Sequence, residues 1–169
     1  MRKTRVQQVG VALIEVMVSV AILALGLLGM AGMQARSLMM NQSSHYRSIA
    51  ADLAGDLADR IHANRSPYLS GSGSATSAPL PPDFSKCTQG STDKSTTSCL
   101  AQGSGVQSYR ASTEISEWNT TVRAQLPSAT WSLTKESGAI SGYYRYTLSI
   151  TWLDDRTTAG NATYSVVIE

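Results

Sequence analysis

An almost uncharged stretch near the start of the chain, VALIEVMVSVAILALGLLGMAGM at Val11–Met33, decides the fold. Glu15 is the one ionisable residue among its 23 positions. As an α-helix the stretch would extend about 35 Å at 1.5 Å per residue, enough to cross the hydrocarbon core of a bilayer. We therefore expect residues 11–33 to form a membrane-spanning helix.

The charges on either side of this stretch predict its orientation. Arg2, Lys3 and Arg5 precede it and no comparable cluster follows Met33, which favours a cytoplasmic N-terminus and export of the rest of the chain. A cleaved secretory signal peptide is disfavoured, because its apolar region is usually about 7 to 15 residues long and is followed by a small-x-small cleavage site. An uncleaved signal anchor in front of a periplasmic binding or enzymatic domain is the plainest alternative.

The length and charge of the chain exclude other classes. With 169 residues the chain is long enough for one domain and too short for two ordinary ones, which excludes a multidomain enzyme. Without Arg2, Lys3 and Arg5, 11 basic side chains stand against 12 acidic ones. A near-neutral chain offers no phosphate-binding footprint, so we expect no nucleic-acid partner.

Glu15 is the anomaly in the apolar stretch, since a carboxylate within a membrane helix costs on the order of 2.5 to 3.5 kcal/mol by insertion scales. Gly10 stands immediately before Val11. Cleavage between these two residues would create an ammonium group at Val11 and make Glu15 the fifth residue of the mature chain. A carboxylate one helical turn from an amine is suited to pair with the amine of a neighbouring subunit in a helical stack.

The run Gly10-Val-Ala-Leu-Ile-Glu15, with a short basic leader before it and the apolar stretch after it, closely resembles the class III leader of type IV prepilins and pseudopilins. That family usually has Phe as its first mature residue, where this chain has Val11. The resemblance implies that residues 1–10 are a leader peptide, which a prepilin peptidase removes between Gly10 and Val11 on the cytoplasmic face. It also implies that the new N-terminus at Val11 is methylated and that Glu15 contacts the N-terminus of a neighbouring subunit.

The helical pattern continues as an amphipathic helix over residues 34–64. Apolar side chains return there at three- or four-residue steps, at Leu38, Tyr46, Ile49, Leu53, Leu57 and Ile61. The outer face is charged, and Asp56 and Arg60 could form an i,i+4 pair worth a few tenths of a kcal/mol. Asn64 and Pro67 signal the end of the helix, which would be roughly 80 Å long from Val11.

Two further stretches, Gly26–Gln34 and Tyr46–Arg65, are similar to the PilV family of type IV pilus minor pilins. The similarity is dense over the first 65 residues and looser beyond them. It implies a minor pilin that joins other minor pilins to prime or cap type IV pilus assembly, supporting pilus biogenesis, twitching motility and cell adhesion.

The resemblance also implies partners and a location. The partners are other minor pilins, the major pilin, prepilin peptidase, the inner-membrane pilus assembly machinery and, on the family's account alone, a tip adhesin. The location is the bacterial inner membrane, crossed once with the N-terminus cytoplasmic and the head periplasmic, and the pilus after assembly. A minor pseudopilin of a type II secretion system is the closest alternative, and the residues near Asp59 and Arg60 favour the pilus.

Residues 65–169 are expected to form a periplasmic globular head. Its first part, residues 66–112, is rich in Ser, Gly, Thr and Pro and predicts a long loop. Cys87 and Cys99 lie in this loop, and in an exported region they predict a disulfide. A zinc site is the alternative explanation of the two cysteines. No histidine lies near them, so they would supply too few ligands for zinc. We expect no metal site and no cofactor.

A short helix is predicted over residues 113–126. Apolar side chains recur there at helical spacing, at Ile115, Trp118, Val122 and Leu126. Ser112 or Thr113 offers an N-cap, and Glu114 and Glu117 would then lie early in the helix, where they favour its dipole.

Alternating apolar and polar residues predict antiparallel strands over residues 129–169. The apolar faces of the three strands comprise Trp131 and Leu133; Tyr144, Tyr146, Leu148, Ile150 and Trp152; and Ala162, Tyr164, Val166 and Ile168. The predicted fold is therefore α+β. It is a pilin-like lollipop in which a long N-terminal helix, membrane-spanning in one half and amphipathic in the other, packs on a small antiparallel sheet head.

No catalytic constellation appears in the sequence. The two histidines, His45 and His62, lie on the long helix without a motif around either, and Glu114 and Glu117 are explained better as helix-stabilising residues than as a catalytic pair. No phosphate-binding loop occurs. We expect no enzymatic activity and a mechanism based on assembly.

Overall fold

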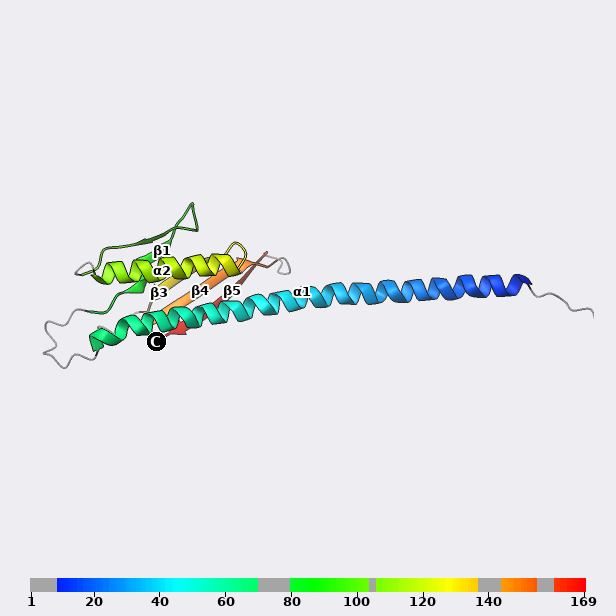
Figure 1. The fold of residues 1–169 in the computed structure, drawn as a ribbon, viewed down its shortest axis with the longest axis horizontal. Helices are drawn as coiled ribbons and strands as arrows, with labels where there is room; N and C mark the ends of the chain where they lie inside the picture. Colours follow the sequence, from blue (N-terminus) through cyan, green and yellow to red (C-terminus); the bar gives the residue numbers. More distant parts are fainter. Residues whose placement is uncertain (1–8, 70–79, 104–105, 137–143, 155–159) are drawn as a thin grey trace, which may run out of the picture. The chain divides into compact units, whose positions relative to one another are not determined.

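The computed structural model describes residues 9–69, 80–103, 106–136, 144–154 and 160–169. Two compact units make up the chain, Met1–Gln42 and Ser43–Glu169, and we call the second the head. Helix α1 (Val9–Leu69) supplies the described residues of the first unit and the first element of the head. The other elements are η1 (Phe84–Lys86), β1 (Cys87–Gln89), β2 (Thr97–Cys99), α2 (Val106–Gln125), β3 (Thr130–Lys135), β4 (Tyr146–Leu153) and β5 (Asn161–Ile168) (Figure 1).

Helix α1 is longer at both ends than the predicted residues 11–64. It begins at Val9 and ends at Leu69, so the expectation that Asn64 and Pro67 would end it is wrong. Asn64 is buried, and its side-chain amide donates a hydrogen bond to the carbonyl oxygen of Arg60, at 2.9 Å. A tertiary environment that satisfies this amide keeps the helix intact at a residue that often ends helices.

The apolar face of α1 in the head lies where the spacing predicted it. Leu53, Leu57 and Ile61 are buried, and Tyr46 and Ile49 are half-buried against the same core. Leu38 was expected on this face but is 69% exposed, because it precedes the head. Burial therefore begins later along the helix than its hydrophobic pattern does.

The main sheet of the head is antiparallel with the strand order β3-β4-β5. Its register places Trp131 opposite Ile150 and Leu148 opposite Val166. The core face of β4 is fully buried at Tyr146, Leu148, Ile150 and Trp152. The predicted α+β class, with a long N-terminal helix and a small antiparallel sheet, is confirmed.

The opposite face of this sheet is rich in Ser and Thr. Ser149 and Ser165 share a hydroxyl hydrogen bond of 2.8 Å across β4 and β5, and Thr151 and Thr163 share one of 2.9 Å. One face thus packs on the helices and the other presents hydroxyl groups, as the period of two in the strands requires.

The prediction of a long loop over residues 66–112 is wrong for the described part of this range. Within its described part, the structure contains η1 and a hairpin in which β1 pairs with β2 in antiparallel fashion, with Cys87 opposite Cys99. Three-residue strands are too short to show a period in the sequence. Residues 70–79 and 104–105 of that prediction lie outside the described residues.

The predicted start of the next helix is also wrong. The helix was expected over residues 113–126, whereas α2 begins at Val106. Ser112 and Thr113 therefore lie inside the helix, where both hydroxyls donate to the carbonyl oxygen of Tyr109 instead of capping a terminus. Glu114 and Glu117 are likewise not in the first turn. Instead of interacting with the helix dipole, they form ion pairs with Arg60 of α1.

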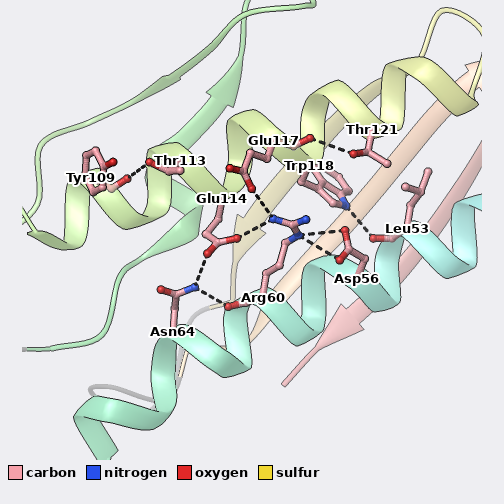
Figure 2. Close-up of polar contacts among 10 residues, drawn as sticks. All are labelled: Leu53, Asp56, Arg60, Asn64, Tyr109, Thr113, Glu114, Glu117, Trp118 and Thr121. Carbon is pink, nitrogen blue, oxygen red and sulfur yellow. Dashed lines mark hydrogen bonds and ion pairs between the residues drawn. The ribbon is translucent and has the colours of Figure 1, made fainter.

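Helices α1 and α2 lie side by side in the head, with the strands behind them (Figure 2). Trp118 of α2 is fully buried and donates its indole N–H to the carbonyl oxygen of Leu53 of α1, at 2.8 Å. Its ring meets that of Trp131 of β3 edge to face, with centroids 5.5 Å apart. One tryptophan thus joins both helices and the sheet.

Candidate functional site

The candidate site residues Gly10, Val11 and Glu15 all lie at the start of α1. Gly10 and Val11 are in its first turn, whereas residues 1–8 of the predicted leader lie outside the described residues. The side chain of Glu15 is exposed, and the backbone carbonyl of Glu15 accepts a hydrogen bond of 2.7 Å from the hydroxyl of Ser19. The structure leaves cleavage, methylation and subunit contact at these residues as predictions.

The stretch of α1 that follows is mostly apolar, and it is exposed throughout. Every side chain from Leu13 to Gln42 is exposed, including 13 large hydrophobic ones up to Met33. Burying one such side chain is worth about 1.5 to 3 kcal/mol, so leaving all of them in water would cost on the order of 20 kcal/mol or more. Lipid or other protein must therefore cover this surface.

By length and composition, one helix is able to cross a membrane among the described residues, and it comprises Leu13–Arg65. Its apolar part lies near the N-terminus, and none of that part is buried. The chain therefore has one candidate membrane span and is compatible with a membrane-anchored protein.

A charged cluster fixes the other half of α1 to α2 (Figure 2). The guanidinium group of Arg60 donates to Asp56 at 3.1 Å, to Glu114 at 2.7 Å and to Glu117 at 3.3 Å. The i,i+4 pair of Asp56 and Arg60 was predicted, and its extension to two carboxylates of α2 was not. We call these four residues the Arg60 cluster.

The planar fork of Arg60 explains why one cation serves three carboxylates, since guanidinium presents several donors in fixed directions. Partial burial by itself lowers the pKa of Arg60, but the hydrogen bonds to Glu114 and Asp56 outweigh it and raise the pKa. The hydrogen bonds therefore favour the charged form of Arg60. The second amide contact of Asn64, 3.3 Å to Glu114, continues the cluster along the two helices.

The predicted disulfide between Cys87 and Cys99 is present, and it joins directly opposed residues of β1 and β2. Its half-cystine at Cys87 is buried in the core. At the other end of the hairpin, both the backbone N–H and the hydroxyl of Ser95 donate to the carboxylate of Asp93 and lower its pKa. The hairpin is thus closed by a covalent bond at one end and by a polar turn at the other.

Asn119, which is fully buried in α2, holds this hairpin against the sheet. Its amide donates to the carbonyl oxygens of Ser95 and Lys94 at 3.0 and 3.2 Å. Its carbonyl oxygen accepts from Gln89 at 3.0 Å and from the indole of Trp131 at 2.8 Å. All four hydrogen-bonding positions of the amide are used, and no sequence motif signalled the role of Asn119.

The histidines lie apart from any such cluster. His45 and His62 are both exposed on α1, and the ring of His62 is hydrogen-bonded to the backbone carbonyl of Glu169. Within the part of the chain that the structure describes, no group of three His, Cys, Asp or Glu side chains could hold a metal ion.

Comparison with known proteins finds no match: no protein-family model, no curated protein and no solved structure is significantly similar to this chain. The functional conclusion therefore depends on the residues and their geometry.

Proposed function

We propose that this chain is a minor pilin, which joins other minor pilins to prime or cap a type IV pilus and thereby supports twitching motility. The observation that carries the proposal is the exposed apolar stretch of α1. From Leu13 to Gln42 every side chain is exposed, and Glu15 is the only ionisable residue between Leu13 and Arg36. A helix with so many exposed apolar side chains is suited to pack against lipid first and against other subunits later.

Glu15 supplies the specificity of that packing. In an apolar surrounding, a carboxylate is stable only with an opposite charge or hydrogen-bond donors close by. Cleavage after Gly10 would provide an ammonium group at Val11 of a neighbouring subunit. Pairing between the two removes the cost of burying either charge alone and fixes the stagger of adjacent helices.

The small residues of α1 support close packing of this kind. Gly26, Gly29 and Gly32 follow one another at every third position, and a Cβ at any of them would have nothing within 4 Å. Each glycine costs about 1 kcal/mol relative to alanine in a helix interior. In an apolar phase that cost is offset when neighbouring backbones approach closely at small residues.

The head contributes a rigid surface. The Arg60 cluster, the disulfide and the four bonds of Asn119 join α1, α2, the hairpin and the sheet. Such cross-links hold the surface that contacts fellow minor pilins or a tip adhesin in one shape, so that binding does not have to order it first.

Replacement of Glu15 tests the proposal. Glu15→Ala should leave membrane insertion intact and lower recovery of the protein in sheared pili by about tenfold or more, as expected if roughly 1.4 kcal/mol or more of contact energy is lost. Ser19→Ala, one turn further along the same helix, is the matched control and should be recovered normally. Normal piliation and normal recovery of Glu15→Ala would contradict the proposal.

Two further measurements define the class of assembly. Mass spectrometry of the membrane-extracted protein should find Val11 as a methylated N-terminus, whereas an intact Met1 would exclude a pilin. Deletion of the gene should abolish surface pili and twitching while protein secretion continues. Loss of secretion with normal pili would exclude the pilus role.

A further inference from the structure

The two edges of the main sheet differ in how they are covered. At the β3 edge, the backbone N–H of Trp131 donates to the side chain of Gln89 at 3.3 Å, and Lys135 forms an ion pair with Asp83 at 3.1 Å. The hairpin and η1 thus flank β3. Strand β5 is the other edge, and among the described residues no further strand pairs with it.

Strand β5 lacks the residues that usually prevent an edge strand from pairing with another chain. Its eight residues, NATYSVVI, include no Lys, Arg, Asp, Glu or Pro. Edge strands usually carry such residues because an open row of N–H and C=O groups invites pairing with another chain. A long edge without them is suited to accept a strand.

A groove of about 420 Å³ runs between β5 and the flank of α1. It is lined by Ala51, Gly55 and Ala58 of α1 and by Tyr164 and Val166 of β5. The small α1 side chains leave the space open. A strand added beside β5 would direct every second side chain toward this groove.

Two carboxylates of α1 flank the groove. Asp52 and Asp59 are exposed three and four residues from Gly55, so they lie at its outer margin on α1. Glu169 and His62 line the groove near the end of β5, and the carboxylate of Glu169 forms an ion pair with Arg145. Arg47, one turn before Ala51, brings positive charge to the opposite end.

We propose that this groove binds an extended strand from the head of a different membrane-anchored subunit. The strand has apolar side chains at alternate positions, which fill the groove, and a Lys or Arg near Asp59. The inference rests on the proposed function only in expecting that the partner is itself a membrane-anchored subunit.

The direction of β5 argues against a second copy of this chain as the partner. The hydroxyl of Ser43 donates to Asp154 at 2.8 Å just before β5, and His62 contacts Glu169 just after it. Strand β5 therefore runs in the same direction as α1 does in the head. Symmetric antiparallel pairing of two β5 strands would make the α1 segments of the two heads run in opposite directions, which does not suit two copies anchored in one membrane.

A photo-crosslinking amino acid at Gly55 of the full-length chain, in its own membrane, tests the proposal. The expected adduct joins position 55 to another membrane-anchored protein, and its mapped peptide is an extended segment with alternate apolar residues and a nearby Lys or Arg. The same probe at Ala63, exposed on the other flank of α1, is the control. Its adduct with that protein should be weaker by about tenfold or more.

A variant that fills the groove gives a second measurement. A Cβ at Gly55 would have nothing within 4 Å, so Gly55→Leu should leave the head as stable as before or more so. With the probe moved to the exposed Val167, Gly55→Leu should lower the partner adduct by about tenfold, whereas Ala63→Leu should leave it unchanged.

The outcomes separate this inference from the proposed function. An adduct with a second copy, an adduct with lipid alone, equal adducts from positions 55 and 63, or no adduct in a chain processed at Val11 would overturn the groove proposal. A partner adduct in a chain that retains Met1 would overturn the minor pilin proposal and support the groove.

Discussion

The first part of α1 and the head differ in the burial of their apolar side chains. From Leu13 to Met33 large hydrophobic side chains are exposed on all sides of the helix, whereas Leu53, Leu57 and Ile61 of the same helix are buried against α2 and the sheet. Hydrophobicity alone therefore does not decide which residues are covered within the chain. The head supplies contacts for its own apolar face, whereas the first part of α1 leaves its apolar side chains exposed.

The largest expected effect comes from one substitution made in both regions. Leu57→Ala should lower the free energy of unfolding of the head by about 2 to 5 kcal/mol, because it creates a cavity in a close-packed core. Leu23→Ala, at a 65% exposed position, should leave that free energy unchanged. Denaturation in detergent, followed by the fluorescence of the three tryptophans, all of which lie in the head, measures both. Equal losses would show that the two regions are not independent.

The second prediction concerns the polar interior of the head. Asn119→Ala leaves the indole N–H of Trp131 and the carbonyl oxygen of Ser95 without their bond to Asn119, whereas Gln89 keeps its own hydrogen bond to the carbonyl oxygen of Lys94. The variant should cost about 2 to 4 kcal/mol, since each buried group left unpaired costs roughly 1 to 3 kcal/mol before relaxation. Thr120→Ala, on the exposed side of α2, is the control. If the two variants unfold at the same denaturant concentration, the hairpin is not held by Asn119.

The third prediction is a loss of stability in alkali. Burial, and next the charge of Asp83, raise the pKa of Tyr146 in the folded head far above its ordinary value. From about pH 10 the unfolded chain ionises at this tyrosine while the folded head does not, so stability is complete below that pH and falls above it by about 1.4 kcal/mol per pH unit. Tyr146→Phe should remove this component, and Tyr109→Phe, at an exposed position, should keep it. Identical alkaline profiles for the wild type and Tyr146→Phe would refute the assignment.

The smallest effect is expected at the Arg60 cluster. Arg60→Met removes a partly exposed cation from three carboxylates and should destabilise the head by about 1 kcal/mol, because solvent screens such pairs. Arg60→Lys should recover only part of the loss, since an ammonium group lacks the fork that reaches Asp56, Glu114 and Glu117 together. The difference between wild type and Arg60→Met should shrink in 1 M salt. A difference that is independent of salt would indicate a packing effect instead.

The elements that the sequence predicted correctly are those whose pattern is long enough to repeat. Strand β4 alternates over eight residues, and its buried positions are the predicted ones. The apolar face of α1 repeats from Leu53 to Ile61. The start of α2 was missed, because among the described side chains of its first seven residues only Gln107 and Ala111 are buried, which is too few for a period to show.

The clusters of the head could not be predicted for a different reason. Arg60 and Glu114 are 54 positions apart, and Asn119 meets Gln89 across 30. No local rule of spacing relates residues at such distances. In the sequence, only the i,i+4 spacing of Asp56 and Arg60 indicated an ion pair on this side of α1.

By itself, the sequence determined the apolar stretch and its isolated Glu15, the disulfide pair, the three main strands and the α+β class, because composition, spacing and alternation are local properties of a chain. The tertiary structure decided which apolar residues find cover, how Arg60 and Asn119 are satisfied, and that β5 leaves an open edge beside a groove. These depend on which distant segments meet, and that is set by the packing of the whole head.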